Sequence, residues 1–421
     1  MVYPEGDRRV VKIRRNRRNY QKGRRRKKAV WFLVIGILFA AGLAAAYYVN
    51  LPHIVMSAWE AQRASADSAK NGQVQSRQGA DARAAAAASS DAGQEDGADA
   101  AEEGSAEAEP EEAAPVTILF TGDVWLDPAV QKNYDAQGID GVLDEGLLSA
   151  MKDADICVIN NEFAFSDRGV QASKQYTYRV DPKYVTILNA MGVDIAGLAN
   201  NHALDFGTEA LSDTFVTIDG AGIRYIGAGD SYAQASAPAV VEAGGQTFAF
   251  LAATHVIPEV SWNVQNRQPG MFSFYDETGL LDAIAAAKEQ YDHVFVLAHW
   301  GQMRTTELTD YQINDGRKFI DAGADAVIGA HPHVLQGIES YGGGYVFYSL
   351  GDFISTNRIE QTVAVTFTYD ADGRAVKIIP AFCSNYRTMT ADAARADGVF
   401  DLLRSISQTI AIDADGVLSA R

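Results

Sequence analysis

Residues 194–207, DIAGLANNHALDFG, and residues 325–334, DAVIGAHPHV, carry the strongest signal for the fold. In each stretch a short apolar run leads directly into polar side chains. Apolar runs of this length, bounded by glycine, predict buried strands. In an open α/β sheet, ligands bind beyond the carboxyl ends of the strands. The two stretches therefore predict a sheet that delivers asparagine and histidine side chains to one edge.

The same arrangement recurs three more times along the chain. The apolar runs 117–120, 156–159 and 294–298 lead into Asp123, Glu162 and His299, respectively. Carboxylate, amide and imidazole groups are ligands of divalent transition metals. We therefore predict a centre for one or two divalent ions (Mn, Fe or Zn) with the ligands Asp123, Glu162, Asn201, His299, His331 and His333.

His202 and Asp205 are predicted to be catalytic. An unligated histidine beside the metal would serve as a general acid, with its tautomer fixed by the aspartate. Each residue taken alone also has a structural alternative. His202 would cap a helix, Asp123 would belong to a Gly-Asp turn, and Glu162 would form a salt bridge. His299 would be a satisfied core histidine, and the two histidines of His331-Pro332-His333 would be solvated in a turn.

Strand and helix patterns alternate from residue 116 onward, which predicts βα units around a buried sheet. A helix is expected to begin at Asp181-Pro182 and end at Gly192, and others over residues 208–220, 279–291 and 309–322. The runs 345–350, 362–369 and 375–382 predict strands with little helix between them, and hence an antiparallel portion. Cys157 and Cys383 would form either a disulfide or two buried free thiols.

The first 115 residues differ sharply in composition from the rest. Residues 1–28 carry 13 Lys/Arg and 2 Asp/Glu, and residues 29–49 are apolar and uncharged. We predict a basic cytoplasmic tail (1–28) and a single transmembrane helix (29–49), so that the following parts lie outside the cytoplasm. The alternative is a signal peptide cleaved near Ala44-Ala45-Ala46. Because the basic run abuts an apolar segment and no nucleic-acid motif accompanies it, nucleic-acid binding is not expected.

Residues 50–115 are rich in Ala, Ser, Gly, Asp and Glu, which predicts a disordered, low-complexity acidic spacer. The folded domain is expected over residues 116–390 and a C-terminal tail over 391–421. Residues 116–421 carry 19 basic and 39 acidic residues, a net charge that would repel a polyanion. Arg179, Arg304 and Arg358 are the candidates for a locally basic cleft.

Several motifs resemble the CapA family, which is named for poly-γ-glutamate capsule biosynthesis and is related to calcineurin-like metallophosphoesterases. They are FTGDVWLD, VINNEFAF, ANNHALDFG, LAHWGQ, GAHPHVLQGIE and YSLGDFI, within residues 116–386. The resemblance implies an α/β sandwich of two sheets flanked by helices, with a site at the strand ends. It also implies that Asp123 and Glu162 are acidic ligands, Asn201 a ligand and His202 the catalytic acid, while His299, His331 and His333 match the remaining imidazoles.

The chain departs from these patterns at four positions. Trp125 stands where the phosphoesterase pattern has a histidine, and Glu162 replaces a shorter aspartate. Met303 and Asp352 stand where family members often carry an acidic residue and an asparagine, respectively. One metal position is therefore predicted to be weak or lost.

The resemblance implies a membrane-anchored factor for the biosynthesis, export or anchoring of a surface capsule polymer such as poly-γ-glutamate. Its partners would be the membrane and the anionic polymer or its synthase complex. Two alternatives remain open. One is a metal-dependent hydrolase of phosphoesters or polymer amide bonds, in which bound ions polarise a phosphoryl or carbonyl oxygen and activate water. The other is a non-catalytic binding module on the same fold.

Overall fold

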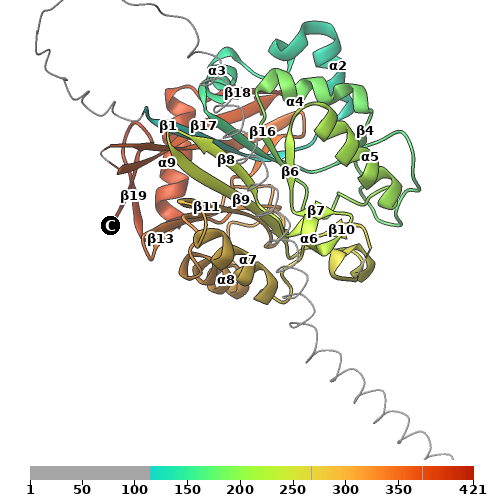
Figure 1. Ribbon diagram of the computed structural model, residues 1–421. Coiled ribbons are helices and arrows are strands. Elements are labelled where there is room, and N and C mark those ends of the chain that lie inside the picture. Colours follow the sequence, from blue (N-terminus) through green and yellow to red (C-terminus); the bar gives the residue numbers. More distant parts are fainter. Residues whose placement is uncertain (1–113, 267, 372) are drawn as a thin grey trace, which may run out of the picture. The chain divides into compact units, whose positions relative to one another are not determined.

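The computed structural model describes residues 114–421, except residues 267 and 372 (Figure 1). The predicted basic tail and transmembrane helix, and all but the last two residues of the predicted spacer, lie outside the described residues. Within the described part of the chain, no helix combines the length and the apolar character needed to cross a bilayer.

The first sheet has eight strands in the order β18-β17-β16-β1-β2-β5-β6, with β15 also pairing with β1. Strands β1, β2, β5 and β6 are parallel, whereas β16, β17 and β18 are antiparallel. The bounds are Val116–Val124 (β1), Ile156–Asn161 (β2), Ile195–Gly197 (β5), Arg224–Ile226 (β6), Asp352–Ile354 (β15), Arg358–Asp370 (β16), Gly373–Ser384 (β17) and Arg387–Thr390 (β18).

The second sheet has six strands in the order β13-β14-β12-β11-β9-β8. Its central strands β9, β11, β12 and β14 are parallel. The bounds are Ala239–Ala243 (β8), Gln246–Thr254 (β9), His293–His299 (β11), Ala326–Ala330 (β12), Ile338–Tyr341 (β13) and Gly344–Phe347 (β14).

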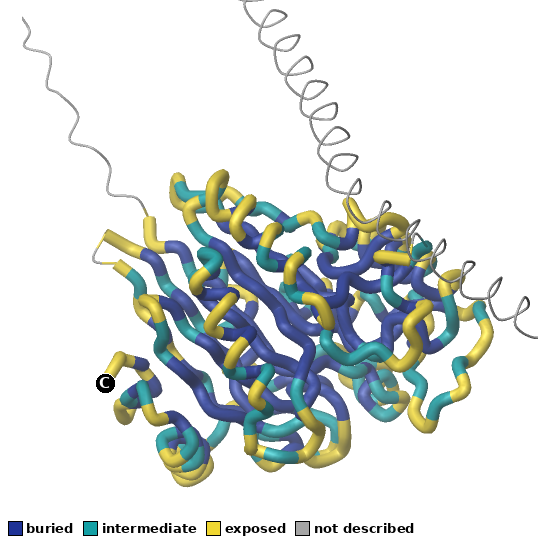
Figure 2. The backbone as a smooth tube through the Cα atoms, turned by 90° about the horizontal axis from the view of Figure 1, so that it is seen from below, coloured by how far each residue is buried: buried dark blue, intermediate teal, exposed yellow. Residues whose placement is uncertain are grey.

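The two sheets pack face to face around a shared core. Alternate side chains of each strand point to opposite faces of its sheet, so one set of side chains enters this core. In β1, Phe120 points between the sheets, where its ring centroid lies 5.3 Å from that of Phe295 on β11. Its neighbour Leu119 points to the opposite face and packs under the helices of the first sheet. Figure 2 shows the resulting buried interior of the strands.

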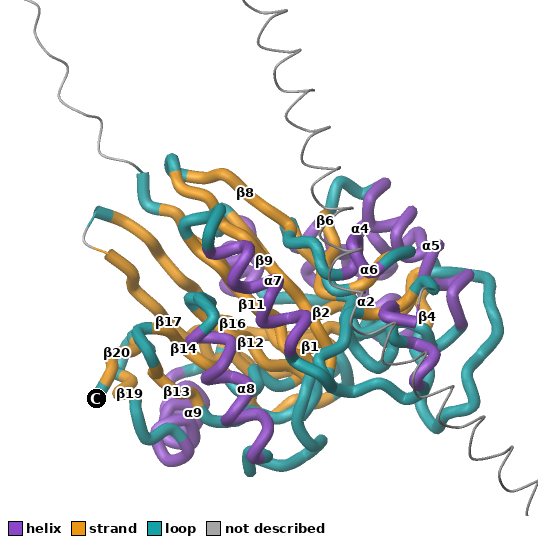
Figure 3. The backbone as a smooth tube through the Cα atoms, turned by 60° about the horizontal axis from the view of Figure 1, so that its bottom comes forward, coloured by secondary structure: helices purple, strands orange, loops and turns teal. Residues whose placement is uncertain are grey.

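Helices cover both outer faces of the sandwich (Figures 1 and 3). Residues of α3, α4 and α5 pack on the first sheet and residues of α7 and α8 on the second. The helix bounds are Pro128–Gln137 (α2), Glu145–Asp153 (α3), Val185–Met191 (α4), Gly207–Gly220 (α5), Tyr232–Ala235 (α6), Thr278–Lys288 (α7), Asp310–Asp321 (α8) and Ala393–Ile406 (α9). Short strands complete the unit at Ala164–Phe165 (β3), Arg179–Val180 (β4), Ala228–Gly229 (β7), Gly270–Met271 (β10), Ile410–Ile412 (β19) and Leu418–Ala420 (β20).

The prediction of an α/β fold with two sheets flanked by helices is confirmed for the described residues. The four predicted helices correspond to α4, α5, α7 and α8, although the expected first turn at Pro182 is a separate 3-10 turn, Pro182–Tyr184, before α4. Helices α2, α3, α6 and α9 were not predicted.

Residues 391–421, expected as a tail beyond the domain, are part of the folded unit. Helix α9 buries Val399, Phe400 and Leu403 in the core between the sheets, and β19 and β20 pair with each other beside it. The apolar spacing of α9 is therefore used for packing, and the compact unit reaches the C-terminus.

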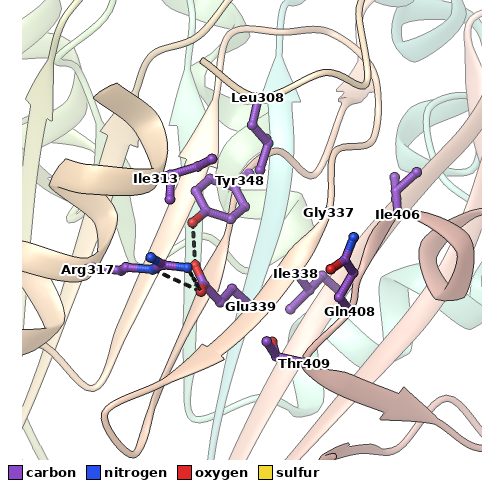
Figure 4. Close-up of a pocket in the computed structure, with 10 residues that line it drawn as sticks. All are labelled: Leu308, Ile313, Arg317, Gly337, Ile338, Glu339, Tyr348, Ile406, Gln408 and Thr409. Carbon is purple, nitrogen blue, oxygen red and sulfur yellow. Dashed lines mark hydrogen bonds and ion pairs between the residues drawn. The ribbon is translucent and has the colours of Figure 1, made fainter. Parts of the chain in front are cut away.

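A cavity of about 250 Å³ lies where this C-terminal segment meets α8 and β13 (Figure 4). At its floor, the Glu339 carboxylate accepts hydrogen bonds from Arg317 Nη2 (2.6 Å) and from the Tyr348 hydroxyl (2.6 Å). The residues that line it are Leu308, Ile313, Arg317, Gly337, Ile338, Glu339, Tyr348, Ile406, Gln408 and Thr409, and they include no predicted site residue.

Both cysteines are buried and free, so the alternative of two buried thiols is the correct one. Burial raises the pKa of Cys383 to about 11 and raises that of Cys157 still further. A thiol with a raised pKa is a poor nucleophile and a poor metal ligand at neutral pH.

Candidate metal centre

Parallel pairing brings the predicted ligands to one edge of the sandwich. Near the end of strand β1, Asp123 is in register with Asn160 of β2, and in the other sheet His299 of β11 is in register with Ala330 of β12. His331 follows immediately. The backbone N–H of His331 donates to Asp123 Oδ2 at 3.1 Å, which joins the two sheets at this edge.

One ligand cluster is rich in imidazole. The candidate ligand atoms of Glu162, His299 and His331 lie within 4.8 Å of one another, and all three residues are buried. His299 Nε2 lies 2.7 Å from Asn201 Oδ1 and 3.5 Å from Glu162 Oε1. The structure thus brings the predicted ligand Asn201 to this cluster.

A second cluster shares Glu162 and is rich in carboxylate. Ligand atoms of Asp123, Glu162 and His333 also lie within 4.8 Å of one another. His333 Nδ1 is 3.2 Å from Asp123 Oδ2 and 3.9 Å from Glu162 Oε2. Because Glu162 belongs to both clusters, its carboxylate would be shared if an ion were bound at each.

The carboxylates of the centre outnumber its positively charged side chains. Burial, followed by the neighbouring Asp123, raises the pKa of Glu162 well above its usual value. Burial opposes protonation of His333, but the carboxylates of Glu162, Asp123 and Asp352 outweigh it and raise the pKa of His333 to about 12. Burial and the neighbouring His333 lower the pKa of His331 to about 3, so that its imidazole is neutral and suited to ligation.

Two buried atoms support the fit of a metal to these residues. Glu162 Oε1 and His331 Nδ1 are buried without a hydrogen-bond partner among the described residues. Buried polar atoms are nearly always satisfied, so such exceptions at one site need an explanation. The buried Asp, Glu and His groups here could hold divalent ions, and their mixture of oxygen and nitrogen suits Mn, Fe or Zn.

His202 and Asp205 lie beside the clusters and contact each other. His202 Nδ1 is 2.6 Å from Asp205 Oδ2, and the other oxygen, Oδ1, is 2.6 Å from Lys174 Nζ. Lys174 also donates to the carbonyl oxygen of Asn201 at 2.5 Å. When the Nδ1–H group of His202 donates its hydrogen bond to Asp205, the other ring nitrogen, Nε2, is available to exchange a proton with a bound ligand.

Trp125 contributes packing where the phosphoesterase pattern has a histidine. Its ring stacks on Tyr178 with centroids 4.3 Å apart, and Tyr178 stacks on His202 with centroids 4.0 Å apart. The three rings form a column that fixes the plane of the His202 imidazole.

Four residues of the centre were not predicted. Asn160 donates to Asp123 Oδ1 at 2.8 Å, and Asp352 Oδ1 lies 3.0 Å from His333 Nδ1. Asp352 had a signal in the sequence, because Gly351-Asp352 follows an apolar run as Gly122-Asp123 does. Lys174 and Tyr178 had none, since they come from an irregular loop between β3 and β4.

The three candidate arginines differ in their positions. Arg358 forms an ion pair with Glu360, and the Arg179 guanidinium lies over the ring of Phe206. Arg304 is exposed, and its backbone N–H donates to Pro332 O, between the two histidines of the centre. Of the three, Arg304 is thus tied by its backbone to the centre.

Replacing Gly122 with alanine is expected to destabilise the domain by about 3 kcal/mol. A Cβ atom there would lie 2.0 Å from the carbonyl oxygen of Gly351, which neither backbone can accommodate without moving. Gly220→Ala, at the end of α5 with no heavy atom within 4 Å of the added methyl, is the matched control. Urea denaturation of both variants would measure the difference, and equal midpoints would contradict the close approach.

Comparison with known proteins gives a family match. Residues 117–357, more than half of the chain, match the family described as bacterial capsule synthesis protein PGA_cap. The chain is 31% identical over 238 residues to the PGA biosynthesis protein CapA of Bacillus subtilis, covering 56% of this chain and 62% of that protein. It is 28% identical over 273 residues to the capsule biosynthesis protein CapA of Bacillus anthracis, covering 62% and 66%.

A probable polyglutamine synthesis accessory protein of Mycobacterium tuberculosis is 33% identical over 211 residues, covering 48% of this chain and 55% of that protein. The chain thus spans less than two thirds of the length of each of these relatives. Among solved structures, a hypothetical protein of Thermus thermophilus is 16% identical with a TM-score of 0.41, covering 63% of this chain and 98% of that one.

Proposed function

Because the chain belongs to the bacterial capsule synthesis protein family, we propose that it acts in the biosynthesis of a surface capsule polymer of the poly-γ-glutamate type. Relatives named for PGA and capsule biosynthesis support this role. We further propose that residues 29–49 anchor the chain in the membrane, with the folded unit outside the cytoplasm. The partners would then be the anionic polymer or its synthase complex.

A second candidate function is metal-dependent hydrolysis of a phosphoester or of a polymer amide bond. The observation that favours it is the His202–Asp205 pair placed beside two ligand clusters that share Glu162. A binding module without chemistry would need the clusters but not this pair. The two functions are compatible, since hydrolysis could release or trim a polymer during its synthesis.

In this scheme the residues of the centre divide into metal ligands, orienting residues and a general acid. Asp123, Glu162, Asn201, His299, His331 and His333 would hold one or two divalent ions, which supply Lewis-acid polarisation of a phosphoryl or carbonyl oxygen. Asp205 orients His202 by accepting a hydrogen bond from its Nδ1–H group, and Lys174 holds Asp205 in place. Burial lowers the pKa of His202, so this role needs the doubly protonated ring, which would give its Nε2 proton to the leaving group and keep its Nδ1 proton on the Asp205 side.

The test is elemental analysis of the purified full-length protein beside a His331→Ala/His333→Ala variant. We expect near-stoichiometric Mn, Fe or Zn in the parent protein and its loss in the variant. His255→Ala, a histidine that stacks on Tyr311 outside both clusters, should keep the metal. In the producing cell, deletion of the gene should reduce the surface polymer, and only the parent and the His255→Ala gene should restore it. An unchanged polymer after deletion would refute the proposed role.

A further inference from the structure

Two Gly-Asp dipeptides lie side by side at the centre of the strand-end site. Strand β15 runs parallel to β1 with Asp352 in register with Asp123, and Asp123 N donates to Gly351 O at 2.9 Å. The approach is close because Gly122 has no side chain, as the 2.0 Å contact of a Cβ there shows. The carboxylates of Asp123 and Asp352 therefore start from adjacent backbone positions.

Three carboxylates converge on one imidazole nitrogen as a result. His333 Nδ1 is 3.0 Å from Asp352 Oδ1, 3.2 Å from Asp123 Oδ2 and 3.9 Å from Glu162 Oε2. Asp352 lies in β15, Asp123 lies in β1, and Glu162 directly follows β2. Three carboxylates around a single imidazole carry more negative charge than that group can balance, whereas a divalent cation would offset two of the three charges.

The two clusters differ in their chemistry. Around His333 the other groups are all carboxylates, and the indole of Trp125 offers no ligand. The cluster of Glu162, His299 and His331 has two imidazoles and the Asn201 amide oxygen. Its buried Glu162 Oε1 and His331 Nδ1, without a hydrogen-bond partner among the described residues, point to a bound ion rather than to a self-contained polar network.

We propose that Asp352 is a metal ligand, and that it makes the Asp123–Glu162–His333 position an oxygen-rich site selective for Mn²⁺. The Glu162–His299–His331 position then takes Zn²⁺ or Fe²⁺, because imidazole suits these ions and carboxylate suits Mn²⁺. This inference rests on the metal centre of the proposed function and extends it to a centre with two unlike ions.

The experiment loads the metal-free full-length protein with equal concentrations of Mn²⁺ and Zn²⁺. Bound metal is measured by elemental analysis and Mn²⁺ by electron paramagnetic resonance. The parent protein should bind one equivalent of each. Asp352→Asn, which keeps the shape of the side chain, should bind Mn²⁺ at least about tenfold more weakly and keep the Zn²⁺ equivalent. Glu360→Gln, an exposed acid on the adjoining strand β16, is the matched control and should behave as the parent.

Each outcome decides the matter. Asp352→Asn binding Mn²⁺ as tightly as the parent would overturn the inference and leave the proposed metal centre standing. A parent protein that binds no metal would overturn both. Thermal melting of the metal-free variants separates these results from misfolding, since Asp352→Asn and Glu360→Gln should melt within a few degrees of the parent.

Discussion

Glu162→Gln should lose both metal ions while leaving the metal-free protein at least as stable as the parent. Glu162 offers one carboxylate oxygen to each ligand cluster, so a single neutral replacement weakens both positions. In the metal-free protein the same residue is fully buried beside Asp123, which raises its pKa. A glutamine removes that like-charge repulsion at almost constant volume.

Thermal melting with and without Mn²⁺ measures both halves of this prediction. A ligand at 1,000 times its dissociation constant stabilises the folded state by about 4 kcal/mol. The parent protein and Glu360→Gln should therefore melt higher when metal is added, and Glu162→Gln should not. A metal-induced increase in Glu162→Gln equal to that of the parent would contradict the shared-ligand arrangement.

His202→Ala should lower hydrolytic turnover by about 100- to 10,000-fold, the usual contribution of a general acid. The bound metal should remain, because His202 lies beside the clusters and its Nδ1 contacts Asp205 rather than a candidate ligand side chain. Steady-state hydrolysis of bis(p-nitrophenyl) phosphate by the metal-loaded protein would measure the change, with kcat reduced and KM little altered.

Asp205→Asn tests the orienting role in the same assay. It should reduce kcat by a smaller factor than His202→Ala, because the imidazole remains but loses the acceptor that fixes its tautomer. His255→Ala should match the parent protein. Turnover by His202→Ala at the parental rate would exclude the assigned acid, and metal-loaded protein without turnover on phosphoesters or polymer would favour a binding module.

Local sequence patterns predicted much of the fold. The apolar runs before Asp123 and His299 are short and stop at polar residues, which is typical of buried strands whose backbone groups pair within a sheet. By contrast, α9 was missed because a short amphipathic helix near the end of a chain has no partner visible in the sequence. Only the core between the sheets shows where Val399 and Phe400 are buried.

The residues of the candidate site likewise divide into those that local sequence patterns predicted and those that they did not. Its histidines and the carboxylates of Asp123 and Glu162 were found because each lies at the end of an apolar run, and the parallel strands of a sheet end at a common edge. Lys174 was not found, because its contact with Asp205 depends on the path of an irregular loop.

The sequence by itself determined the α/β alternation, the family resemblance and the six predicted metal ligands. The tertiary structure alone decided how those residues divide into two clusters, that Glu162 belongs to both, and that Asp352 stands beside Asp123. The physical reason is that residue type and periodicity are local properties. Distances between side chains depend instead on strand register and on the close approach that Gly122 permits, and both arise only when distant segments pack.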